Sequence, residues 1–213
     1  MRDLVRHTGG VHRWAATTVR TASADPVDGD LERLVGGWPS DGELVDWFRD
    51  GHGALVTTLR DAPADVQCYT FLRAPSPLAM WSRRQLHETT IHRVDAELVT
   101  DRLTTPRSDV AADGIDELLS LFITRRRGQL RLDPPRTIAV EATDTGAGWT
   151  VAVSTEPVVT ATGVDPGADL VVRGPAPSLY LWLWNRADAT DLDVTGDRSL
   201  LATWRELVQV SWR

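Results

Sequence analysis

Hydrophobic residues in the first two-thirds of the chain recur every three or four positions, which is the spacing of one face of an α-helix. This pattern predicts helices over residues 2–22, 41–62, 74–99 and 107–127, with a loop over 25–41. The positions expected to face inward are Leu4, His7, Val11, Trp14 and Thr18 in the first helix, Val45, Phe48, Leu55, Val56 and Leu59 in the second, Met80, Trp81, Ile91, Val94 and Leu98 in the third, and Ile115, Leu118, Leu119 and Phe122 in the fourth. Gly9 and Gly10 weaken the first helix and indicate that another segment approaches it closely.

The pattern changes after Asp133, Pro134 and Pro135, which have the composition of a linker. Alternating polar and apolar residues then predict a hairpin of two strands, a third strand and two helices separated by a short strand. The predicted ranges are 136–144, 148–155, 169–174, 177–187, 191–197 and 199–210. The fold class is therefore α+β, with a helical domain over residues 1–130 and a small α+β domain over 131–213.

The composition is that of an ordinary globular protein, with 42% hydrophobic and 25% charged residues in a chain of 213. The formal net charge is −7, and the basic run 125–127 is too short to offset it, so we expect no nucleic-acid partner. No apolar run approaches the roughly 18 residues of a membrane span, and no signal peptide opens the sequence. We therefore expect a cytoplasmic protein without a membrane partner.

Cys68 is the single cysteine of the sequence, which excludes a disulfide within the chain. It could be a nucleophile. However, no histidine stands beside it in sequence, and buried cysteines are usually inert. We therefore expect no catalytic role for Cys68.

Three polar residues of the third predicted helix share one face. With Glu88 at zero on a helical wheel, His92 falls at about 40° and Asp95 at about −20°. Trp81 lies at about 20°, so the three polar groups are predicted to point inward beside the apolar stripe. A buried carboxylate is costly unless a cation or a metal compensates its charge. The face is either part of a metal site or a hydrogen-bond network without metal.

A third metal ligand could come from another histidine. His7 shares its helix face with apolar residues, whereas His12 lies about 140° away and is predicted to be on the surface. His52 is a second inward candidate, although a core or cleft histidine is the simpler interpretation. His87 is expected to contribute to packing.

His7, Glu88 and His92 would give two nitrogens and one oxygen from two helices. This set leaves a coordination position open for water or substrate. We expect zinc, although nickel, iron and manganese accept the same ligand types. Asp95 could orient one of the ligand side chains without binding the metal itself, or it could pair with an arginine.

Two segments, "RDLVRHTGGVHRWA" and "RRQLHETTIHRVDAE", resemble the metal-bearing helices of the mycothiol-dependent maleylpyruvate isomerase family. The segment "DLVVRGPAPSLYLWLWNRADATDLDVTGD" resembles the C-terminal domain of that family, which is similar in shape to sterol carrier proteins. The resemblance implies a DinB-like antiparallel helical bundle with His7, Glu88 and His92 as zinc ligands. Arg186 matches an arginine that the family offers toward its active site, which implies anion binding; a helix-terminal surface arginine is the alternative.

Members of the family usually begin with a further helix before the segment that resembles residues 2–7. Either the true start lies upstream of Met1, or the bundle lacks that first helix. A missing helix would leave the first apolar face partly uncovered and favour dimerisation or poor stability, so we expect a monomer or a homodimer. We expect a misplaced start.

The resemblance also implies that mycothiol supplies the sulfur as a cosubstrate. A metal-bound thiolate could catalyse a cis–trans isomerisation, or it could attack an electrophile and remain attached, as in an S-transferase. Asp95 and Arg186 are then the candidate catalytic residues, and a small electrophilic molecule is the partner. The alternatives are a zinc hydrolase and a non-catalytic metal-binding or ligand-binding paralogue.

Overall fold

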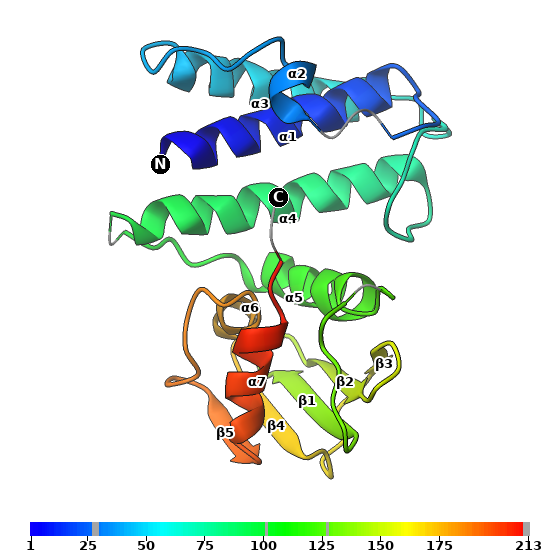
Figure 1. Cartoon of the computed structure of the whole chain (residues 1–213), viewed down its shortest axis with the longest axis vertical. Helices are drawn as coiled ribbons and strands as arrows, with labels where there is room; N and C mark the ends of the chain where they lie inside the picture. The colour runs from blue at the N-terminus through cyan, green and yellow to red at the C-terminus, as the bar shows by residue number, and fades with distance from the viewer. Residues whose placement is uncertain (27–29, 101, 127, 211–213) are drawn as a thin grey trace. The chain divides into compact units, whose positions relative to one another are not determined.

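The computed structural model describes residues 1–26, 30–100, 102–126 and 128–210 (Figure 1). The chain divides into two compact units, Met1–Thr104 and Thr105–Arg213. The boundary predicted after residue 130 falls inside the second unit, because the helix that begins at Ser108 packs against a helix of that unit. Among the described helices, none combines the length and the apolar character needed to cross a membrane.

The first unit is helical. It contains α1 (Arg2–Arg20), α2 (Leu31–Leu34), α3 (Leu44–Asp61) and α4 (Pro77–Leu98). Helix α4 begins where the sequence provides a start signal: the Ser76 side chain accepts a hydrogen bond from the Ala79 amide, and Pro77 occupies the first turn. Helix α1 packs against both α3 and α4, and it runs antiparallel to α4 (Figure 1).

The Gly9–Gly10 pair permits the close approach that the sequence predicted. The indole of Trp47 lies directly over Gly9, so a Cβ at that position would clash with the ring. Arg13, one turn later, stacks on the same indole with its guanidinium carbon 3.8 Å from the ring centroid. This contact joins α1 to α3.

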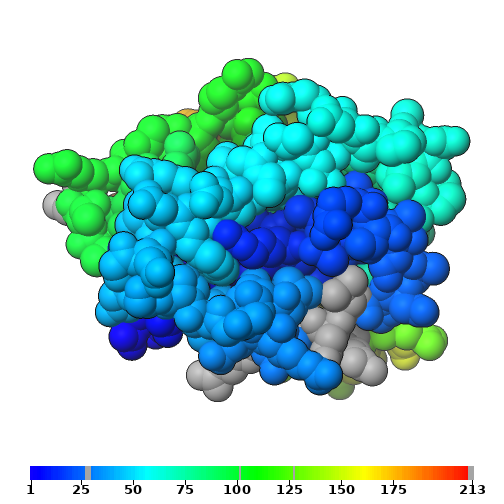
Figure 2. Space-filling model, turned by 90° about the horizontal axis from the view of Figure 1, so that it is seen from above, coloured from blue at the N-terminus to red at the C-terminus, as the bar shows by residue number. Residues whose placement is uncertain are grey.

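Helix α1 is covered by α3 on one side and by α4 on another, so more of its surface is buried than the single inward face predicted from the sequence. His12 was predicted to be on the surface, yet it is fully buried. Figure 2 shows part of α1 as a strip between the segments that carry α2 and α3. On the other helices, Val45, Val56 and Leu98 were predicted to face inward, but their exposed fractions are 55%, 37% and 46%.

The second unit is α+β, which confirms the predicted fold class. It contains α5 (Ser108–Asp116), the π-helix η1 (Glu117–Phe122), β1 (Arg136–Ala142), β2 (Ala147–Val153), β3 (Val159–Thr162), β4 (Leu170–Gly174), α6 (Ala176–Leu183), β5 (Asp193–Gly196) and α7 (Ser199–Leu207). The helix predicted over 107–127 therefore changes to a π-helix at Glu117 and ends at Phe122. Arg127, in the predicted basic run, lies outside the described residues.

Within the described residues, five strands form one sheet in the order β3-β2-β1-β4-β5. The predicted hairpin is confirmed as the antiparallel pair β1–β2, and Gly146 in its turn has a φ of 71°. Strand β4 pairs parallel with β1 on the other side. One face of the sheet is buried, and its side chains include Ile138, Val140, Trp149, Val151, Leu170 and Val172.

Helix α6 ends in a Schellman motif. The amide of Arg186 donates to the Leu181 carbonyl at 2.8 Å, and the amide of Asn185 donates to the Trp182 carbonyl at 2.9 Å. Asn185 has a φ of 61°, the left-handed conformation that this motif requires. The motif fixes the point at which Arg186 leaves the helix.

Candidate metal centre

His7 on α1 and Glu88 and His92 on α4 bring their side chains together. The Nε2 atoms of His7 and His92 lie 3.1 Å and 3.0 Å from the same oxygen, Oε1 of Glu88. The two imidazole rings are nearly perpendicular, with centroids 5.0 Å apart and an interplanar angle of 84°. Within the described residues, these three form the group whose ligand atoms could hold a metal ion, since all lie within 4.8 Å of one another.

This geometry fits a divalent ion. Ligand atoms about 2.0–2.1 Å from a tetrahedral zinc are about 3.3 Å from one another. The distances from Glu88 Oε1 to the two imidazole nitrogens are shorter than this by a few tenths of an ångström. An ion could therefore replace the shared hydrogens after a small outward movement of the side chains, and three protein ligands would leave a coordination position open.

Asp95 contacts the opposite edge of the His92 ring, with Oδ2 2.9 Å from Nδ1. This contact directs Nε2 toward Glu88 and Nδ1 away from it. Burial by itself would lower the pKa of His92, but hydrogen bonds to Asp95 and Glu88 outweigh burial and raise that pKa to about 9. Without metal, His92 is thus an imidazolium ion between two carboxylates.

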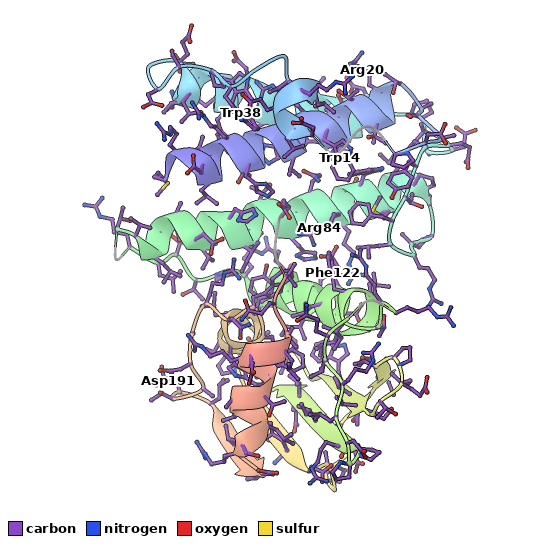
Figure 3. The ribbon with its side chains drawn as sticks, viewed as in Figure 1. Trp14, Arg20, Trp38, Arg84, Phe122 and Asp191 are labelled. Carbon is purple, nitrogen blue, oxygen red and sulfur yellow. The ribbon has the colours of Figure 1, made fainter. Side chains whose placement is uncertain are left out.

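Arg84 holds the second oxygen of Glu88. Its Nη2 donates to Oε2 at 2.8 Å, and both residues lie on one face of α4, four positions apart (Arg84 is labelled in Figure 3). Burial would raise the pKa of the Glu88 carboxyl, but hydrogen bonds from His7 and His92 and the Arg84 charge keep it well below its usual value. Glu88 is therefore an anion at neutral pH.

The other histidines stand apart from this group. His12 is buried between α1, α3 and α4, where its Nε2 lies 3.0 Å from Thr89 Oγ1. Burial lowers the pKa of His12 to about 4, and a neighbouring His52 adds to this effect, so the ring is neutral at pH 7. His52 was an inward candidate, but it is exposed and packs against the His12 ring. His87 is buried, as expected for a packing residue.

Two family models match the chain. The mycothiol maleylpyruvate isomerase N-terminal domain matches residues 1–97, and the MDMPI C-terminal domain matches residues 109–203. Together they cover most of both units. The chain belongs to the mycothiol maleylpyruvate isomerase family. Its helical unit is the DinB-like domain of that family, as the resemblance implied, and the family name implies mycothiol and an isomerase reaction.

Among curated proteins, no sequence gives a significant match to this family member. A comparison with solved structures gives partial matches at low TM-scores. A UbiJ-SCP2 ubiquinone synthesis protein is 20% identical over 48% of this chain and 96% of that chain, with a TM-score of 0.34. A double mutant of the sec-alkyl sulfatase PisA1 is 11% identical over 86% of this chain, with a TM-score of 0.39. The sec-alkylsulfatase Pisa1 from Pseudomonas sp. is 15% identical over 96% of this chain, with a TM-score of 0.34. The chain spans only 27% and 28% of the length of these two sulfatase chains.

Cys68 and Arg186, which were also singled out from the sequence, are not part of this group. Cys68 lies in the loop between α3 and α4, where partial burial raises the pKa of its thiol, so it is protonated at neutral pH. Arg186 belongs to the second unit, and its Nη1 donates to the Trp184 carbonyl at 2.7 Å. Its proposed role toward an anion stays a prediction.

Arg84 and the pairing of His12 with Thr89 were not predicted from the sequence. For Arg84 a signal was available, because an arginine four residues before an inward-facing glutamate lies on the same helix face. For His12 none was available, because the helical period does not show that α3 covers that side of α1.

Proposed function

We propose that this chain is a divalent-metal-dependent enzyme that uses mycothiol as a cosubstrate. It would act as an isomerase or an S-transferase on a small electrophilic molecule. The observation that carries this proposal is the convergence of His7, Glu88 and His92 from α1 and α4 on one point. The family name is the basis for proposing mycothiol as the thiol and isomerisation as the reaction class.

The residues of the chain have distinct tasks in this proposal. His7 and His92 offer imidazole nitrogens to the ion, and Glu88 offers one carboxylate oxygen. Asp95 keeps the Nε2 atom of His92 turned toward the site. Zinc is the expected ion, and when bound it would hold the mycothiol sulfur as a thiolate, far below the free thiol pKa of about 8.5.

The thiol has to come from outside the chain. Cys68 is the single cysteine, and its raised pKa keeps the sulfur protonated. A free thiolate is the nucleophile that adds to carbon, so a protonated and partly buried cysteine is a poor substitute.

In the isomerase reaction, a bond forms between the sulfur and one carbon of a conjugated double bond. The former double bond is then single and rotates, after which the carbon–sulfur bond breaks and the double bond returns in the other geometry. In the S-transferase reaction, the carbon–sulfur bond remains and the electrophile gains a proton or loses a leaving group. In both, Arg186 would bind a carboxylate of the substrate by paired hydrogen bonds.

The test begins with the metal content of the purified protein. The metal-loaded protein is then assayed with maleylpyruvate for isomerisation and with monochlorobimane for thiol conjugation, each with and without mycothiol. We expect Glu88→Ala to remove both the metal and the thiol-dependent activity, while the exposed control Glu32→Ala keeps both.

Three outcomes would contradict the proposal. Folded, metal-free protein with full activity would exclude a metal-dependent reaction. Activity without thiol would favour a hydrolase. A metal-loaded protein without activity toward any electrophile would favour a non-catalytic binding protein.

A further inference from the structure

The two oxygens of Glu88 have different partners. Oε1 faces the imidazole nitrogens of His7 and His92, whereas Oε2 accepts a hydrogen bond from Arg84 Nη2 at 2.8 Å. A carboxylate can bind a metal through one oxygen or through both, and chelation by both uses an additional coordination position. In this structure Oε1 lies within hydrogen-bond distance of both imidazole nitrogens, and Oε2 is turned to Arg84.

Arg84 is buried, which distinguishes its pair with Glu88 from an ordinary helix surface pair. The side chains of Arg84 and Glu88 are 5% and 16% exposed. Arg93 and Glu97, with the same order and spacing on the same helix, are 3.8 Å apart and 41% and 20% exposed. Water screens the exposed pair and competes with it, whereas the buried arginine has a charge-assisted hydrogen bond that is costly to break.

We propose that Arg84 is a positioning residue that restricts Glu88 to one-oxygen coordination and so keeps a metal coordination position open. The inference rests on the proposed function in one respect, since it assumes that His7, Glu88 and His92 bind a divalent ion. It adds the reason why that ion can accept an external ligand such as a thiol. With Arg84 in place, Oε2 is not available to the ion, and the fourth position remains for the ligand.

The test uses cobalt(II) as the metal and azide as the external ligand, because cobalt(II) reports its coordination number through its visible absorption. Four-coordinate tetrahedral cobalt absorbs several times more strongly than five- or six-coordinate cobalt. The variants are Arg84→Met, Arg84→Lys and the matched control Arg93→Met. Circular dichroism establishes that each protein is folded, and Arg84→Gln replaces Arg84→Met if that variant does not fold.

We expect Arg84→Met still to bind cobalt, about 10- to 100-fold more weakly than the wild type, because the three ligands remain and a partner of Glu88 is lost. Its visible absorption should fall at least twofold, and its azide affinity should fall at least about tenfold, because Glu88 then binds through both oxygens. Arg84→Lys keeps a cation that donates to Oε2 and should restore both properties in large part. Arg93→Met should match the wild type.

Two results overturn the inference. The first is a folded Arg84→Met or Arg84→Gln protein that binds cobalt with unchanged absorption and unchanged azide affinity. The second is loss of cobalt binding in the folded Met, Gln and Lys variants alike, which would make Arg84 a requirement for binding rather than for the binding mode. Failure of the wild type to bind cobalt would instead refute the metal site of the proposed function, so the two failures are distinguishable.

Discussion

His7 and Glu88 are 81 positions apart in sequence, yet the Nε2 atom of one lies 3.1 Å from the Oε1 atom of the other. The contact joins α1 to α4 at the polar end of a helix pair whose other end is aromatic. There, Trp14 and Trp81 pack edge to face with ring centroids 4.8 Å apart (Trp14 is labelled in Figure 3). The aromatic contact fixes the register of the two helices, and the register brings the imidazole to the carboxylate.

Asp95→Asn tests the orientation of His92. An amide cannot match a carboxylate as an acceptor for the Nδ1 hydrogen, so His92 loses part of what fixes its tautomer. We expect metal affinity to fall by about 10- to 100-fold. In the metal-free protein, the pKa of His92 should fall below about 9, as measured by NMR titration. The control Asp46→Asn removes an exposed contact with Arg49, and it should change neither quantity.

The stability of the metal-free protein should depend on pH through two histidines with opposite shifts. The folded-state pKa of His92 is about 9 against an ordinary 6.5, so its stabilisation is complete below pH 6.5 and is lost as the pH rises through 9. The folded-state pKa of His12 is about 4, so its contribution is present above pH 6.5 and is lost as the pH falls toward 4.

We therefore expect maximal stability of the metal-free protein near pH 6.5, the ordinary histidine pKa. Between pH 7 and pH 9 the free energy of unfolding should fall by up to about 1.4 kcal/mol per pH unit, the maximal slope for one proton. Urea unfolding at a series of pH values measures this. His92→Gln should remove the alkaline decline, and a wild-type profile that is flat from pH 7 to 9 would contradict the prediction.

Gln85→Leu should stabilise the protein. Gln85 is 3% exposed, and among the residues that the structure describes neither its amide oxygen nor its amide nitrogen has a hydrogen-bond partner. An unpaired buried polar group costs about 1–3 kcal/mol, which an apolar side chain of similar size avoids. We expect the free energy of unfolding to rise by about 1 kcal/mol. The control Gln67→Leu alters an exposed residue, and a loss of stability in Gln85→Leu alone would show that its amide is paired in solution.

Gly9→Ala should destabilise the first unit. A Cβ at this position meets the indole of Trp47, which is held in place by the Arg13 guanidinium on its face. Overpacking of this kind costs about 1–3 kcal/mol. The matched control Gly53→Ala lies in α3 with nothing near its Cβ, and it should stabilise the helix by up to about 1 kcal/mol. Thermal unfolding of both variants compares them, and equal midpoints would contradict the expected clash.

Local signals in the sequence were sufficient for many elements of the fold. The hairpin predicted over 136–155 depends on a few neighbouring residues and is found as the antiparallel pair β1–β2. The helix predicted over 177–187 ends at Leu183 instead, because Asn185 adopts the left-handed conformation. The elements that were missed are α2 and β3, which have four residues each. A helix of one turn is not stable without the rest of the fold, and β3 depends on pairing with β2.

The sequence by itself determined that Glu88, His92 and Asp95 share one face of a helix, because the helical period sets the angle between residues. The tertiary structure decided which neighbour meets each face. It placed His7 against Glu88 Oε1. It also buried His12, which the helical period predicts to be on the surface, because α3 covers a second side of α1. A periodic pattern records the direction of each side chain along its own helix, whereas packing between distant segments determines what lies in that direction.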